Sequence, residues 1–267
     1  MKNTIFIVLA LTLAAGTAFG ALGDVVASWP APERIPLGLA RGPDPSQMWV
    51  YCNEWPNLIY RVHSDTGLVY GSFFHYEAQN NVRGLSFSCG GPAPYSGNYL
   101  WVGDVLNRCV YMSDPATGRV YLSYSIASAP SGLAVEATGD GGLAPKAMFM
   151  DESVIGAHVY RLQLTTGSVL SSFLFDSPYI KDIAYDWRNN LVWATWARDG
   201  AVVGCDADTG SIAASFPSPP GTPYAFTYCG EYLWIGTTNY HYVYKVHCPA
   251  DISVAPASLG RVKALFK

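Results

Sequence analysis

The segment Thr209-Gly210-Ser211-Ile212-Ala213-Ala214-Ser215-Phe216 holds the pattern on which the fold assignment rests. It joins a Thr-Gly pair to a Ser-aromatic pair, and the Ser follows the Gly by five residues. Gly adopts the positive φ that a tight turn requires, and the residues after it are strand formers. The segment therefore predicts a tight turn followed by a short β-strand.

The same pattern occurs three more times, earlier in the chain. The four turn glycines are 51, 49 and 43 residues apart, which is the size of a four-stranded propeller blade. A strand-like segment also precedes each Thr-Gly pair. The matching positions are Gly67 with Ser72-Phe73, Gly118 with Ser123-Tyr124, Gly167 with Ser172-Phe173, and Gly210 with Ser215-Phe216.

Two further strand-like segments recur five times. The first is short and apolar, and its small residues suit the crowded axis of a propeller. The second carries a Trp in four of its five copies. The first kind lies at 38–40, 84–86, 132–134, 182–184 and 224–226, and the second at 48–51, 100–103, 147–150, 192–195 and 233–236.

The fifth repeat reaches Cys248 without an outer strand, and the missing strand is found near the N-terminus. Gly23 to Trp29 matches Gly210 to Phe216 position for position, including the Ser and the aromatic residue. An unpaired sheet edge invites aggregation, so a strand donated from the N-terminus both covers the edge and fastens the ring. We therefore predict an all-β, five-bladed β-propeller of four-stranded blades, with the last blade closed by the N-terminal strand.

The two ends of the chain are expected to lie outside this domain. Lys2, the apolar run 5–15 and small residues at Ala18 and Gly20 are typical of a secretory signal peptide. We expect a signal peptide at 1–20, the propeller at 21–250 and an exposed tail at 251–267. The tail is similar to short basic and apolar C-terminal tails of exported bacterial proteins. A secreted protein, extracellular or periplasmic and without a membrane span, is the resulting expectation.

Composition narrows the range of partners. Charged residues make up 13% of the chain and the formal net charge is −4, without basic clusters, which argues against nucleic acid as a partner. We expect a monomer. The six cysteines allow fifteen pairings in an oxidising compartment. Among these pairings, a bridge between Cys229 and Cys248 would staple the blade that closes the ring.

Polar residues at the entrance of the innermost strands suggest a ligand site at the top mouth of the axial channel. Arginine, lysine, aspartate and tyrosine together suit a carboxylate, a phosphate or a sugar. The alternative is a solvated rim with a local contact between Lys181 and Asp182. The candidate ligand-binding residues are Arg83, Lys181, Asp182 and Tyr224 there, with Trp196 and Arg198 after a second strand.

Acidic residues follow the second strands of three neighbouring blades. Converging carboxylates can bind Ca²⁺, and a pair of them can serve acid–base chemistry on sugars. The alternative is that these acids only keep the surface soluble. The candidate metal ligands are Glu54, Asp104, Asp151 and Glu152, and no other cofactor is indicated.

The blade pattern resembles a broad family of propellers. Gly-Leu-Ala, then Leu-Trp-Val-Gly-Asp, then Val-Tyr-x-x-Asp-x-x-Thr-Gly is similar to the secreted NHL/YVTN/SMP-30-like group, which includes binding modules, scaffolds and a few metal-dependent hydrolases. The Asn-Glu-Leu-Glu and Phe-Gly-Glu-Gly stretches of the five-bladed plant-type glutaminyl cyclases do not occur here. Five-bladed glycosidases need three axial carboxylates, and only Asp182 stands at such a place.

Two functional hypotheses result. The first is an exported, non-catalytic binding or scaffold protein whose ligand is a small molecule, a glycan or another protein. The second is a metal-dependent hydrolase or lyase that uses the acidic residues of the same face. The repeat pattern, without a recognised catalytic motif, favours the first.

Overall fold

A computed structural model of the chain describes residues 20–42, 44–53, 58–78, 82–92, 94–136, 147–152, 158–175, 180–196 and 200–249. For residues 147, 151, 152 and 196 it describes the backbone alone. The expected signal peptide, apart from Gly20, and the expected tail lie outside the described residues. Within the described part, no helix is long and apolar enough to cross a membrane.

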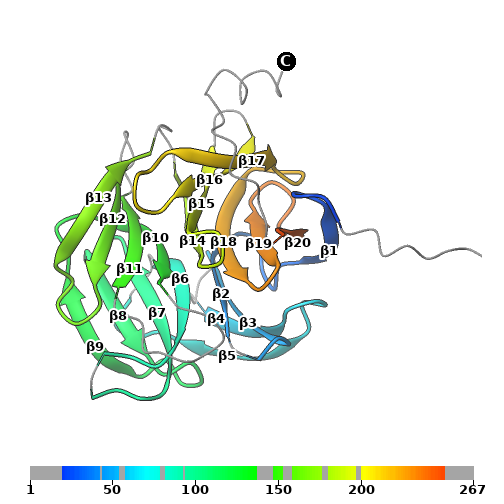
Figure 1. Cartoon of the computed structure of the whole chain (residues 1–267). Coiled ribbons are helices and arrows are strands. Elements are labelled where there is room, and N and C mark those ends of the chain that lie inside the picture. The colour runs from blue at the N-terminus through cyan, green and yellow to red at the C-terminus, as the bar shows by residue number, and fades with distance from the viewer. Residues whose placement is uncertain are drawn as a thin grey trace, which may run out of the picture.

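Twenty strands form five antiparallel sheets of four strands each, and the sheets stand as blades around a central axis (Figure 1). This arrangement confirms the predicted five-bladed β-propeller. From the innermost strand outward, blade 1 is β2 (Pro36–Arg41), β3 (Gln47–Cys52), β4 (Leu58–His63) and β5 (Val69–Phe74). Blade 2 is β6 (Val82–Cys89), β7 (Asn98–Asp104), β8 (Cys109–Ser113) and β9 (Val120–Ser125). Blade 3 is β10 (Pro130–Val135), β11 (Ala147–Glu152), β12 (His158–Gln163) and β13 (Val169–Leu174).

The last two blades complete the ring. Blade 4 is β14 (Ile183–Asp186), β15 (Leu191–Trp196), β16 (Ala201–Asp206) and β17 (Ile212–Pro217). Blade 5 is β18 (Pro223–Cys229), β19 (Tyr232–Thr237), β20 (Tyr242–His247) and, as its outermost strand, β1 (Val25–Pro30).

Strand β1 closes the ring as the sequence predicts. It pairs with β20 in antiparallel register, with Trp29 opposite Val243 and Ser28 opposite Tyr244. In Figure 1 the blue strand β1 lies beside β20, the last strand of the chain. Blade 5 is therefore built from both ends of the propeller, and its sheet forms only when these ends meet.

The innermost strands contact one another in turn around the axis. Glycine permits the closest of these approaches. A Cβ on Gly84 would lie 2.7 Å from the Cα of Gly132, and one on Gly38 would lie 2.9 Å from the Leu85 side chain. Blades 1, 2 and 3 therefore pack almost backbone to backbone at the axis.

The hydrophobic core consists of five clusters, and each cluster fills the seam between two neighbouring blades. The second strand of every blade sends one large aromatic side chain into the seam with the following blade. These side chains are Trp49, Trp101, Phe149, Trp193 and Trp234, and all are at most 5% exposed.

The strand pairing refines the repeat alignment by one residue in two blades. In blade 3, Phe149 stands opposite Ala134, so Phe149 and not Met148 occupies the place of the Trp. In blade 5, Trp234 stands opposite Thr227, so the innermost repeat begins at Ala225 and not at Tyr224.

A ring-on-glycine contact repeats in all five seams. The aromatic residue of each outer strand packs on the turn glycine of the next blade, so the two recurring halves of the pattern meet between blades. The glycines have φ between 70° and 92°, and an added Cβ would lie 2.4 to 2.9 Å from the ring. The pairs are Trp29 on Gly67, Phe73 on Gly118, Tyr124 on Gly167, Phe173 on Gly210, and Phe216 on Gly23.

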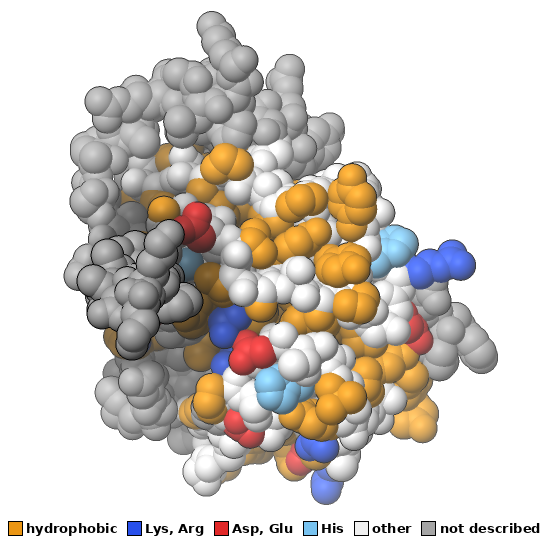
Figure 2. Space-filling model, turned by 90° about the vertical axis from the view of Figure 1, so that its right-hand side faces the viewer, with side chains coloured by type: hydrophobic (Ala, Val, Ile, Leu, Met, Phe, Trp, Pro, Cys, Tyr) orange, Lys and Arg blue, Asp and Glu red, His pale blue; other side chains and the backbone are white. Residues whose placement is uncertain are grey.

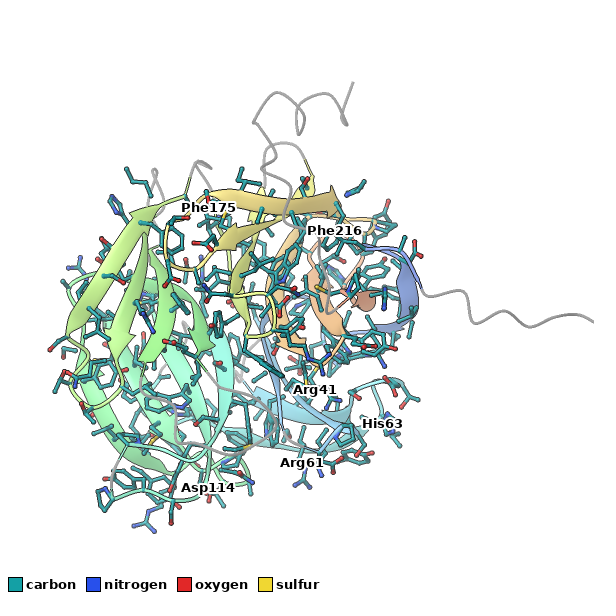
Figure 3. The ribbon with its side chains drawn as sticks, viewed as in Figure 1. Arg41, Arg61, His63, Asp114, Phe175 and Phe216 are labelled. Atoms are coloured by element: carbon teal, nitrogen blue, oxygen red, sulfur yellow. The ribbon has the colours of Figure 1, made fainter. Side chains whose placement is uncertain are left out.

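The seam between blades 5 and 1 is also held by polar contacts. The indole nitrogens of Trp29 and Trp234 both donate to the carbonyl oxygen of Ser64, at 2.9 and 3.3 Å. Lys245 of β20 forms an ion pair with Asp65 at 2.8 Å. In Figure 3, Arg41 lies between blades 1 and 5, and its guanidinium is 4.8 Å from the Trp234 ring centroid. Phe216, labelled in the same view, fills the seam between blades 4 and 5.

The predicted bridge between Cys229 and Cys248 is absent from the structure, and none of the six cysteines forms a disulfide bond. The two residues face opposite sides of the blade 5 sheet. Cys229 packs into the seam with blade 1, whereas Cys248 packs into the seam with blade 4, where its Sγ lies 3.9 Å from Asp186 Oδ2. The structure holds the closing blade by packing instead.

The outer strands leave apolar side chains on the outer wall of the ring. Hydrophobic side chains gather on the side of the molecule that carries β1 (Figure 2). Val25 and Val26 are about half exposed there, and Val69 and Tyr70 of β5 are similarly exposed.

His75, in the connection from β5 to β6, is buried in the seam between blades 1 and 2. Its Nε2 lies 2.8 Å from the hydroxyl of Ser113, and its Nδ1 accepts the amide of Ala78 at 3.2 Å. Burial lowers the pKa of His75 to about 4. This imidazole is therefore neutral at physiological pH.

The ring-on-glycine contact predicts three different outcomes for three Gly→Ala substitutions. Gly118→Ala combines backbone strain with overlap on the Phe73 ring, so we expect about 2–4 kcal/mol of lost unfolding free energy. Gly230→Ala meets no neighbour within 4 Å but has φ +66°, which predicts about 1 kcal/mol. Gly71→Ala has neither cost and should be neutral within about 0.5 kcal/mol. Urea denaturation measures all three, and equal effects would contradict the account.

The buried imidazole predicts acid sensitivity. Because the pKa of His75 falls from 6.5 to about 4 on folding, the unfolded chain binds the proton more readily. The free energy of unfolding should be unaffected by this group above about pH 6.5, and it should fall by up to about 3 kcal/mol as the pH drops to about 4. In His75→Gln, whose amide can replace one ring hydrogen bond, this slope should flatten. His158→Gln, at a half-exposed position, is the control, and an unchanged slope in His75→Gln would contradict the assignment.

Candidate functional site

The upper face of the ring is the face on which the second strand of each blade connects to the third and the first strand begins. Four of the five innermost strands carry a β-bulge at this end. Bulges change the direction in which side chains point and are frequent near functional sites. The bulged positions are Leu37, Gly84, Ser131 and Tyr224.

Three of the predicted residues come together where blade 4 meets blade 5. The ammonium group of Lys181 lies 5.4 Å from the centroid of the Tyr224 ring, within the range of a cation–π contact. Tyr224 also packs against the cluster between blades 1 and 2, and so it reaches across blade 1. Residues from several blades therefore converge at the mouth of the axis.

Asp182, by contrast, is a structural residue of the mouth. Its side chain is fully buried, and its two oxygens accept the backbone amides of Ile183 and Phe226 at 2.9 and 2.8 Å. The second of these bonds crosses from blade 4 to the innermost strand of blade 5. Asp182 thus ties two blades together at the point where blades 1 to 3 use a glycine.

Arg83 lies at the upper end of β6, on the innermost strand of blade 2. It stands opposite Gly103 and directly before the bulged Gly84. Its Nε is shielded from solvent and has no hydrogen-bond partner. Tyr51 is close enough to sense this charge: burial raises the pKa of Tyr51 to about 12, and Arg83 opposes that rise.

Asp104, the one predicted metal ligand whose side chain the structure describes, is engaged in its own turn. Its two carboxylate oxygens accept the backbone amide of Asn107 at 3.0 Å and the side-chain amide of Asn107 at 2.7 Å. Glu54 lies outside the described residues, and only the backbones of Asp151 and Glu152 are described. In the described part of the chain, no three His, Cys, Asp or Glu side chains form a metal-binding group.

The side chains of the remaining two predicted ligand residues, Trp196 and Arg198, are not described, so their place relative to the upper mouth is not assigned. Only the backbone of Trp196 is described, where it pairs with Ala201, and Arg198 lies outside the described residues. Sequence reasoning missed Thr195, which is buried on the upper end of β15 with a hydroxyl that has no partner. Its place, two residues after the Trp of the second strand, is the signal that could have identified it.

The described mouth carries two carboxylates, Asp182 and Asp104, and two cations, Arg83 and Lys181. Each carboxylate accepts hydrogen bonds from two amide groups, whereas the cations stand at the upper ends of blades 2 and 4. Such a mouth suits ligands that combine an anionic group with a flat face for stacking.

Comparisons with known proteins define the fold and no more. No protein-family model matches the sequence, and no curated protein is significantly similar to it. Among solved structures, the glutaminyl cyclase of Myxococcus xanthus is similar with a TM-score of 0.62 and 9% identity, over 84% of this chain and 95% of that one. The Cps50 (Swd1) propeller domain of Myceliophthora thermophila has a TM-score of 0.53 and 8% identity, over 85% and 100%.

These likenesses support the propeller architecture across most of the chain. At such low identity they carry neither activity nor ligand. The resemblance to the NHL/YVTN/SMP-30-like group stays a prediction.

The engagement of Asp104 predicts that metal removal leaves the fold unaffected. A bound ion would stabilise the folded state by mass action and raise the melting temperature. Because we expect no such ion, EDTA and added Ca²⁺ should shift the melting temperature by less than about 1 °C. Differential scanning calorimetry with and without chelator measures this, together with elemental analysis. A rise of many degrees with Ca²⁺ would instead support a metal site and the hydrolase hypothesis.

Proposed function

We propose that the protein is an exported, non-catalytic binding or scaffold protein whose ligand docks at the upper mouth of the propeller axis. The observation that carries the proposal is the Lys181–Tyr224 pair, in which a cation lies 5.4 Å from an aromatic ring at the entrance of the innermost strands. Aromatic and cationic groups at a channel mouth are suited to binding polar ligands.

The residues that surround this pair favour a binding role over a catalytic one. Asp182, next to Lys181, is held by two backbone amides, so this acid is a structural brace. Tyr224 lies on β18, and Lys181 lies two residues before β14, next to the anchored Asp182. The site is therefore formed before the ligand arrives, which limits the entropic cost of binding. Export follows from the predicted signal peptide and is part of the proposal.

A glycan and small-molecule screen with matched variants tests this function. Lys181→Met removes the charge and keeps the stem, so a ligand found with the native protein should bind about 5- to 20-fold more weakly. Arg119→Met removes an exposed arginine from the far end of blade 2 and is the control. Titration calorimetry measures both, and equal affinities for native protein and Lys181→Met would place the ligand elsewhere.

A further inference from the structure

We propose that the ligand of the upper mouth carries an oxyanion, a carboxylate or a phosphate, and that Arg83 binds it. This inference rests on the proposed function and adds the chemical class of the ligand. It starts from one observation: a half-buried arginine on the innermost strand has a solvent-shielded Nε without an acceptor.

The backbone around Arg83 is fixed from two sides. Gly84, the next residue, has φ +65° and lies against Gly132 of blade 3, with no space for a Cβ. On the other side, a Cβ on Gly103 would lie 2.6 Å from the carbonyl oxygen of Arg83. The position of Arg83 at the mouth is therefore set by the fold.

No hydrogen bond or ion pair to a described residue engages the Arg83 side chain. Its Nε–H is screened from water and donates to no acceptor, and no ion pair joins Arg83 to a described acid. The acid on the paired strand, Asp104, has both oxygens occupied by Asn107. A buried charged donor without an acceptor is costly, and an incoming oxyanion removes that cost.

Other arginines of the protein show what a structural role requires. Arg161, also half-buried, donates Nε to Glu136 Oε2 at 2.8 Å and a second nitrogen to the other oxygen. Arg41 leaves its Nε without a partner, as Arg83 does, but it donates its terminal nitrogens to the carbonyl oxygens of Asp44, Pro45 and Gln47. A guanidinium presents a planar set of donors that fits a carboxylate or phosphate edge. In Arg83, unlike Arg161 and Arg41, no donor of this set is bonded to a described residue.

A first experiment needs no ligand. Removing an unpaired charge should not weaken the empty protein, so Arg83→Met should melt at the same temperature as the native protein or higher. Arg161→Met, which leaves Glu136 unpaired, should melt several degrees lower. If Arg83→Met melted as low as Arg161→Met, Arg83 would be structural and the proposal would be overturned.

A second experiment tests the oxyanion directly. Succinate, inorganic phosphate and the neutral succinamide are titrated into the native protein, Arg83→Met and Arg108→Met, an exposed arginine of the same face. At least one anion should bind the native protein and Arg108→Met, with a tenfold or greater loss in Arg83→Met, and succinamide should not bind. The anion that binds identifies the source as carboxylate or phosphate.

Three results would overturn the inference: no anion binds, succinamide binds as well as succinate, or Arg83→Met binds as well as the native protein. The two proposals fail separately. A neutral glycan that depends on Lys181 and is indifferent to Arg83→Met would retain the proposed function and remove the oxyanion. A ligand that ignores both variants would remove both.

Discussion

The contact between an outer-strand aromatic ring and the turn glycine of the next blade is the constraint on which the propeller depends. It holds neighbouring blades together in five seams, and in every seam only a hydrogen fits where a side chain would stand. The glycine also needs a positive φ, so one residue satisfies two separate requirements. Because each blade supplies a ring to one neighbour and a glycine to the other, the contact propagates around the axis and closes on itself.

The closing blade differs from the other four because its strands β1 and β20 come from opposite ends of the propeller sequence. Trp29 brings the N-terminal strand to blade 5 and at the same time packs on Gly67 of blade 1. The carbonyl of Ser64 receives two indole donors there, and Lys245 pairs with Asp65. This seam must compensate the entropy of joining distant segments, and its polar contacts contribute to that compensation.

Much of the architecture could be predicted from the sequence because the repeat is physical. A turn glycine and a ring at fixed spacing define a blade, and the match between Gly23–Trp29 and Gly210–Phe216 identified the closing strand. The register within blades was less accessible. Phe149 substitutes for a Trp, and Thr227 for a small residue, so neither alignment can be fixed without the pairing. The prediction of a bridge between Cys229 and Cys248 was wrong because the sequence does not show which face of a sheet each residue occupies.

The sequence predicted where the candidate site lies better than it predicted what each residue does there. The innermost strands had to bring Arg83, Lys181 and Tyr224 to one mouth, and the contact of Lys181 with Tyr224 follows from that topology. The structure was needed for two further points, because both depend on neighbours in space. Asp182 accepts the amide of Phe226 in the next blade, and Arg83 Nε has no acceptor. Functional interest therefore moves from the acids of the mouth to its cations.

Amide hydrogen exchange at the closing strand tests the ring most directly. The amide of Gly23 donates to His247 O, and the amide of His247 donates to Asp24 O, at 3.0 and 2.8 Å. If β1 completes blade 5, both amides should be protected to the same degree as the central strands β3 and β7, since they can open only with the ring. Exchange of Gly23 and His247 at the rate of an unstructured peptide, while β3 and β7 stay protected, would contradict the closed propeller.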